Sequence, residues 1–277
     1  RMRLNAAENE THKSHYHSTP AGSPPRDPCV NQTKMHPIQQ PLFEILRGTI
    51  KESDYPASVM EDRSGRIPGA GFFPGSTGMV EGTKTLQQRR VMVLGQDQDN
   101  QKGHDRSEKK GNELDSKTWE NMRALFGQSG IDEGDCFFTN FIMGVRVGSK
   151  RNTGPSPALA QYEFIHACSL FFIEQLKAQQ PTVILTLGMI PFRLLSLVST
   201  PLRTRSIEVG TFNDLEKCKM LVLDHVEFDM LPGSRFVVVP LCHPSYRLNG
   251  EGRFKSSADS YTSEIELLQD VRKRYLS

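Results

Sequence analysis

The sequence predicts an α/β fold, with three αβα layers around a short, mostly parallel central sheet of four or five strands. Four short apolar runs carry this prediction, at residues 90–94, 136–138, 182–187 and 236–241. Each run has about the length of a buried strand. None alternates polar with apolar residues, which indicates that both faces are covered, as in parallel sheets.

The segments between these runs have the apolar spacing of amphipathic helices. Trp119, Met122 and Phe126 fall on one face of a helix that Asp115 or Ser116 can cap. Further helices are expected around residues 42–46, between Pro157 and Pro181, from Pro191, and over about 260–274. Strands and helices that follow one another in series favour an open three-layer sheet. Residues 220–223 are expected to add an edge strand.

Two segments are predicted to be loops. Residues 68–78 contain Gly or Pro every few positions, and their Phe72 and Phe73 are interpreted as core residues rather than as a pocket wall. The polar segment Gln101–Leu114 shows no apolar periodicity, although its His104 is a candidate for the pocket.

The organisation of the chain follows from where apolar patterning begins. Residues 1–40 are rich in His, Ser, Thr, Pro and Asn and almost lack periodic apolar residues, so we expect a disordered tail. Met35 is a plausible alternative start, which would leave part of this tail untranslated. Residues 41–277 are expected to form a single domain.

Charge and cysteine content exclude several classes of protein. The net charge is only +2, so a nucleic-acid surface must be a local patch. The five cysteines are widely spaced without a CxxC pair, so we expect no metal and a reducing compartment. No apolar run reaches ~18 residues and no secretory signal is recognisable, so an intracellular protein without a membrane span is expected.

Each apolar run ends in polar or glycine residues. The runs are followed by Gly95-Gln96-Asp97, Thr139-Asn140, Gly188 and Cys242-His243-Pro244-Ser245. In open α/β sheets, ligands bind beyond the carboxyl ends of the strands. A carboxylate, an amide, a glycine turn and a histidine are therefore predicted to converge on one crevice.

These same residues carry a resemblance to uracil-DNA glycosylases. VMVLGQD at 91–97 resembles the first motif of that family, GQDPYH, and LCHPS at 241–245 is similar to its second motif, HPSP. FFTNFIMGVR at 137–146 resembles the strand with the base-reading asparagine, and VILTLGMIPFRLL at 183–195 a strand–glycine–helix element. The order matches, and the resemblance covers about residues 89–250.

The resemblance implies a role for each matching residue. Asp97 corresponds to the carboxylate that stabilises the sugar cation and orients water, and His243 to the histidine that bonds the base carbonyl. Gln96 and Asn140 are expected to bind the base. Phosphate or DNA contacts are expected from Gly188 and Ser245, with Arg247 or Leu248 as the wedge. Independently of the resemblance, Lys150 and Arg151 follow the second run and Arg247 the fourth, so they are expected at the pocket end of the sheet as DNA contacts. From the residues alone, Asp97 and Asn140 can also cap or pin turns, and His243 can be a core histidine.

The chain departs from the family motif after Asp97. Gln98-Asp99-Asn100 replaces Pro-Tyr-His, and the family's tyrosine blocks the methyl group of thymine. Asp99 therefore leaves the base selectivity open and is an alternative to Asp97 for activating water. Leu114 is the nearest apolar candidate for the family's stacking phenylalanine.

The predicted function is that of a monomeric DNA glycosylase without metal or organic cofactor. It would hydrolyse the bond between deoxyribose and uracil, or a related base, in a nucleotide flipped out of DNA. Two alternatives stay open: a catalytically inactive nucleic-acid-binding protein of the same fold, and a hydrolase of free nucleosides.

Overall fold

The computed structural model describes residues 40–61, 72, 88–110, 116–148, 154–207, 209–245 and 261–277. All of them lie in one compact unit that spans residues 33–277. The predicted tail lies outside the described residues except for Gln40.

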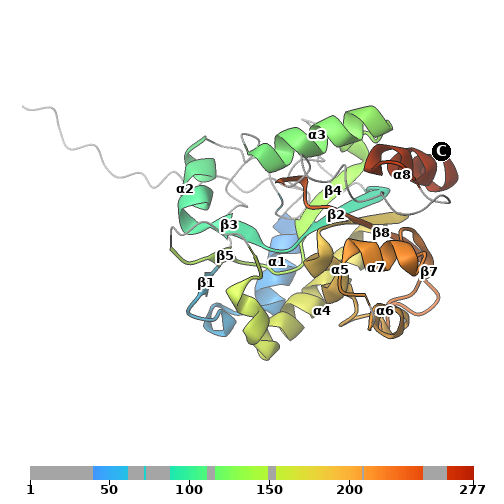
Figure 1. Ribbon diagram of the computed structural model, residues 1–277. Helices are drawn as coiled ribbons and strands as arrows, with labels where there is room; N and C mark the ends of the chain where they lie inside the picture. Colours follow the sequence, from blue (N-terminus) through green and yellow to red (C-terminus); the bar gives the residue numbers. More distant parts are fainter. Residues whose placement is uncertain are drawn as a thin grey trace, which may run out of the picture. The chain divides into compact units, whose positions relative to one another are not determined.

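The core of this unit is a mixed five-stranded sheet with the order β4-β2-β6-β8-β7 (Figure 1). The strands are β2 (Val91–Gly95), β4 (Cys136–Asn140), β6 (Val183–Leu187), β7 (Leu223–Val226) and β8 (Phe236–Leu241). Strands β2, β4, β6 and β8 are parallel to one another and buried along their whole length. Strand β7 is an antiparallel edge strand. The mostly parallel sheet that the apolar runs predict is thus confirmed.

The register of the parallel strands brings their carboxyl ends to one edge. Gly95 at the end of β2 pairs with Asn140 at the end of β4, and Leu187 at the end of β6 pairs with Leu241 at the end of β8. The residues that follow these four strands therefore start from the same side of the sheet.

Helices cover both faces of the sheet (Figure 1). One face carries α3 (Lys117–Ser129) and α8 (Glu264–Val271), and the other carries α1 (Gln40–Thr49) and α4 (Tyr162–Gln179). Neighbouring residues of β4 show the two sides: Phe138 packs against Trp119 of α3, whereas Thr139 donates a hydrogen bond to Gln175 of α4. The remaining α-helices are α2 (Gln101–Lys110), α5 (Met189–Leu195), α6 (Thr200–Ser206) and α7 (Phe212–Lys217). Short 3-10 helices lie at Glu52–Asp54, Glu133–Asp135 and Pro157–Ala160, and Arg272–Leu276 continues α8 as a π-helix.

A small second sheet, which the sequence does not predict, forms beside the end of β2. It has the order β1-β5-β3, with β1 (Val59–Met60), β3 (Gln98–Asn100) and β5 (Val145–Arg146). Strand β3 runs parallel to β5, and Asn100 pairs with Arg146. This pairing holds Arg146 next to the residues that follow β2.

Two sequence predictions are wrong in detail. The segment 101–110 is the helix α2, not a loop, and the remaining 111–114 lie outside the described residues. Asn100 caps this helix, because its Oδ1 accepts the Gly103 N–H at 2.8 Å. The edge strand covers Leu223–Val226 rather than residues 220–223.

Within the described part of the chain, no helix is long and apolar enough to cross a membrane.

Candidate functional site

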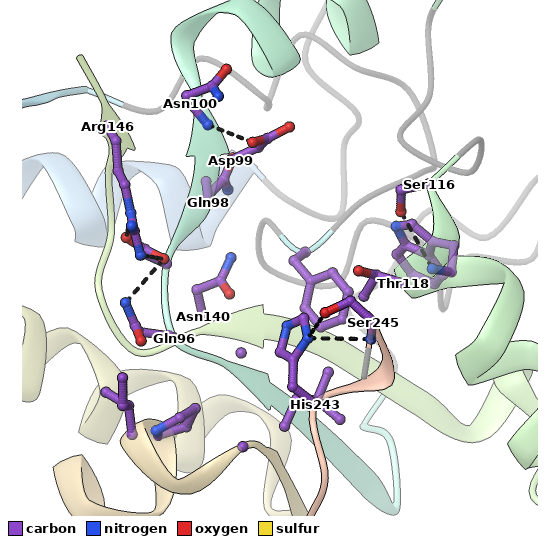
Figure 2. A pocket seen from close by; sticks show the side chains of 18 of the residues that line it. Gln96, Gln98, Asp99, Asn100, Ser116, Thr118, Asn140, Arg146, His243 and Ser245 are labelled. Atoms are coloured by element: carbon purple, nitrogen blue, oxygen red, sulfur yellow. Dashed lines mark hydrogen bonds and ion pairs between the residues drawn. The ribbon is translucent and has the colours of Figure 1, made fainter. Parts of the chain in front are cut away.

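A cavity of about 640 Å³ opens at the carboxyl ends of the four parallel strands. Each strand contributes to its wall: Gln96 and Asp97 follow β2, Asn140 ends β4, Gly188 follows β6, and His243 and Ser245 follow β8. Figure 2 shows Gln96, Asn140 and His243 around the same hollow, with Asp99 and Asn100 on another side. The structure therefore brings the residues after the four apolar runs together.

Asp97 is held by a buried ion pair with Arg146. Arg146 Nε donates to Asp97 Oδ2 at 2.5 Å, and a terminal guanidinium nitrogen donates to Oδ1 at 3.0 Å. The same nitrogen also donates to the Gly154 carbonyl at 3.0 Å. The side chains of Asp97 and Arg146 are 8% and 10% exposed. The two hydrogen bonds therefore fix a largely buried carboxylate in the cavity wall.

Burial and hydrogen bonding act on Asp97 in opposite directions. Burial raises the pKa of the Asp97 carboxyl, and Arg146, Ser156 and Gln96 counteract part of that rise through hydrogen bonds and charge. The net result is a raised pKa. These three partners donate hydrogen bonds to the carboxylate oxygens.

Asn140 lies at the floor of the cavity and is 2% exposed. Its Oδ1 lies so close to β2 that a Cβ atom on Gly95 would come within 2.2 Å of it. This close approach explains the glycine at position 95. The amide nitrogen Nδ2 is buried and has no hydrogen-bond partner among the described residues. An unsatisfied buried donor costs free energy, which a ligand that carries an acceptor can recover.

The ring nitrogen Nδ1 of His243 contacts Ser245, two residues further along the chain. The Ser245 N–H donates to Nδ1 at 3.3 Å, and Ser245 Oγ lies 2.7 Å from the same nitrogen (Figure 2). Because a backbone N–H can only donate, the Ser245 contact assigns Nδ1 as an acceptor and, in the neutral ring, the proton to Nε2. Burial lowers the pKa of His243, so the neutral form persists to lower pH than for an exposed histidine.

Two helices anchor the backbone on either side of His243. The Cys242 N–H donates to Glu264 Oε1 in the first turn of α8 at 2.6 Å. Asn121 of α3 donates from Nδ2 to the Pro244 carbonyl at 2.7 Å. Both contacts join the histidine to the helical layer that covers this face of the sheet.

Phe72 forms an apolar part of the cavity wall. Its ring lies 5.1 Å from Trp119 and 5.7 Å from Phe138, between ring centroids. Phe72 thus belongs both to the core, as predicted, and to the pocket. Phe73, the next residue in the sequence, and Leu114, the candidate for the stacking residue, lie outside the described residues.

Gly188 connects β6 to α5 with a backbone that side chains disfavour. Its φ is +98°, in the left-handed region, and its N–H donates to the Leu241 carbonyl at 2.7 Å. A Cβ atom here would meet the Cβ of His243 at 3.7 Å. The backbone of Gly188 therefore lies directly beside His243 at the carboxyl ends of β6 and β8.

Asp99 lies on the exposed rim of the cavity. Its Oδ1 accepts the Asn100 N–H at 2.7 Å, at the point where β3 leads into α2. Unlike Asp97, this carboxylate faces solvent and has acceptor capacity for water.

Several predicted DNA contacts cannot be placed, because Lys150, Arg151, Arg247 and Leu248 lie outside the described residues. The cavity residues that were not assigned from sequence include Arg146, Arg106 and Phe72 as a wall. Arg146 stands inside the quoted segment 137–146, but neither spacing nor polarity indicates its partner. The described residues include no cluster of three His, Cys, Asp or Glu that could hold a metal ion.

Comparison with known families places the chain in a family of DNA repair enzymes. The family described as the uracil DNA glycosylase superfamily matches residues 83–271, which is more than half of the chain and includes all four parallel strands. A search of curated proteins gives no match.

Proposed function

Because the chain belongs to the uracil-DNA glycosylase superfamily, we propose that it hydrolyses the bond between deoxyribose and uracil, or a related base, in a nucleotide extruded from DNA. Membership supports a glycosylase that acts on DNA in general terms. The observation that carries the finer proposal is the pairing of Asn140 and His243. A buried amide with an unsatisfied donor and a histidine whose pKa is lowered by burial line one cavity of about 640 Å³.

Asn140 has the chemistry to read the edge of a uracil ring. A side-chain amide carries an acceptor oxygen and an NH2 donor group on the same carbon. The edge of uracil presents a ring N–H beside a carbonyl oxygen, which an amide complements with two hydrogen bonds. Cytosine presents an amino donor where uracil has this carbonyl. The buried Nδ2 donor therefore favours uracil over cytosine in this proposal.

His243 would stabilise the departing base. Negative charge builds on the base as the glycosidic bond breaks, and part of it reaches a carbonyl oxygen. Nε2–H of the neutral ring can donate to that oxygen without first losing or gaining a proton. One preorganised donor of this kind contributes a factor of ~10²–10³ in rate.

The two carboxylates have different roles in the proposal. Asp97 supplies negative charge opposite the sugar cation, from a position that Arg146 fixes. Asp99, on the exposed rim, is the carboxylate that can accept a hydrogen bond from the attacking water. Asp99 also occupies the place of the family's methyl-blocking tyrosine, so the proposal includes bases related to uracil.

The test is base release from labelled duplex oligonucleotides, read as strand scission after alkali. The panel contains uracil, hypoxanthine and mismatched thymine at one position. We expect scission with at least one of them, reduced ~10²-fold or more in the separate variants Asp97→Asn and His243→Ala, and about 10²-fold in Asp99→Asn.

The other outcomes identify the alternatives. Tight, salt-sensitive binding of all the oligonucleotides without scission would indicate a binding protein of the same fold. Turnover of free nucleosides without scission would indicate a nucleoside hydrolase. Either result would overturn the proposal.

A further inference from the structure

A second hollow of about 740 Å³ lies along α2, and we call it the α2 groove. Its lining consists of α2 residues and Gly148, which follows β5. The charged lining residues are Lys102, Asp105, Arg106, Lys109 and Lys110. Arg106 also lines the base cavity, so the two hollows adjoin at this side chain. The chain as a whole has 34 basic and 32 acidic residues, so four cations beside one carboxylate form a local positive patch.

Helix stability accounts for Lys109 and Lys110, which lie in the last turn of α2 at the negative end of the helix dipole, but not for Lys102 and Arg106. Lys102 lies in the first turn, at the positive end of the helix dipole, where no acidic residue is present. Lys102 and Arg106 are four residues apart, as are Arg106 and Lys110, so like charges are neighbours on one side of the helix. Within the described ranges, Lys102, Arg106 and Lys109 form no ion pair.

We propose that the α2 groove holds backbone phosphates of the DNA strand that carries the extruded nucleotide. This inference rests on the proposed function. A nucleotide that enters the base cavity brings its flanking phosphates to the cavity mouth, where Arg106 stands. From there the strand follows the cations of α2, and Gly148 leaves room on the opposite side, since no atom lies within 4 Å of where its Cβ would be.

The chemistry of the groove favours a nucleic-acid backbone over an acidic peptide. Phosphates recur along a strand and contact lysine and arginine without regard to sequence. The continuity with the base cavity supplies a reason for a strand to lie here, and a peptide has no corresponding anchor. The contacts of Lys102 and Lys109 are expected to add affinity without base preference.

The test compares two double variants in binding to a uracil-free labelled duplex over a series of salt concentrations. The first is Lys102→Gln with Lys109→Gln, which removes two exposed groove cations and keeps good helix formers. The control is Lys217→Gln with Lys273→Gln, which removes two exposed lysines that line neither cavity.

We expect the groove variant to lower the slope of log affinity against log salt by about 2, because each phosphate contact contributes about 0.9. The control slope should stay within about 0.5 of the wild type. An unchanged slope in the groove variant, or equal changes in both variants, would overturn the inference.

This readout is separate from base release. Base release with an unchanged slope would contradict the groove and leave the proposed function standing. A lowered slope in a protein that releases no base would support the groove and contradict the proposed function, because phosphate binding in the groove needs no chemistry at the base.

Discussion

At the scale of single residues, the candidate site depends on side chains that approach the backbone closely. Gly95 is the clearest case, since Asn140 Oδ1 occupies the space that a Cβ atom would take. The sequence places both residues at strand ends, but it does not show that they pair in register across β2 and β4. Arg146 is not placed at the end of a predicted strand, and the pairing of β3 with β5 in the small second sheet brings it to Asp97.

Replacing Gly95 with alanine is expected to displace Asn140. The new Cβ would come within 2.2 Å of Oδ1, so the amide must turn away from its present position. We expect base release, measured in single turnover, to fall at least tenfold. The matched control is Gly127→Ala in α3, where a Cβ meets nothing within 4 Å. It should leave base release unchanged and stabilise the protein by up to about 1 kcal/mol. Equal rates in both variants would refute this role of Gly95.

Asn140→Asp should weaken the discrimination between uracil and cytosine. The substitution replaces the amide donor with a carboxylate, which accepts hydrogen bonds only when ionised. We expect the ratio of uracil to cytosine release to fall at least tenfold. Asn213→Asp, at an exposed position of α7, is the control and should leave the ratio unchanged. An unaltered ratio in Asn140→Asp would remove Asn140 from base reading.

Arg146→Met should change both stability and the pH profile. The variant leaves a buried carboxylate without its partner, which costs about 3–5 kcal/mol. Arg123→Met, which breaks the exposed pair with Glu133, should cost no more than about 1 kcal/mol. Denaturant unfolding measures both.

The sign of the pH effect follows from the charge of Arg146. The guanidinium lowers the pKa of Asp97 against the effect of burial, so its loss raises that pKa further. If activity needs ionised Asp97, the acid side of the rate profile must move to higher pH. An acid limb that stays in place would show that Asp97 does not supply the charge.

At the scale of elements, the four parallel strands could be predicted because they are buried throughout and read as continuous apolar runs. The helix α2 could not, because it has no apolar face. Its buried residues are Gly103 and His104, and its other described side chains are exposed or half-buried. The signal that was available is Asn100, a good N-cap residue three positions before Gly103.

Removing that cap is expected to loosen α2 alone. Asn100→Ala loses the hydrogen bond to the Gly103 N–H, at a cost of about 1 kcal/mol. Since α2 has little apolar packing to compensate, amide exchange over residues 103–110 should become faster while exchange in the central sheet is unchanged. Thr211→Ala, which removes the cap of α7, should leave α2 exchange as it is. Uniformly faster exchange after Asn100→Ala would contradict a local role for the cap.

At the scale of the whole molecule, the parallel sheet is what turns separate motifs into a site. Polar residues after four strands meet because the strands end at one edge in matched register. This convergence follows from the sequence pattern. The identity of the apolar wall does not follow from it, because Phe72 reaches the cavity from the stretch between β1 and β2, where no strand or helix is predicted.

The most direct test of the central claim is a crystal structure of the Asp97→Asn variant bound to a uracil-containing duplex. The variant slows base release, so the substrate stays intact. We predict an extruded nucleotide in the cavity, with its base edge at the Asn140 amide and a carbonyl oxygen within hydrogen-bond distance of His243 Nε2. A base that stays stacked in the duplex, or that binds away from Asn140 and His243, would contradict the account.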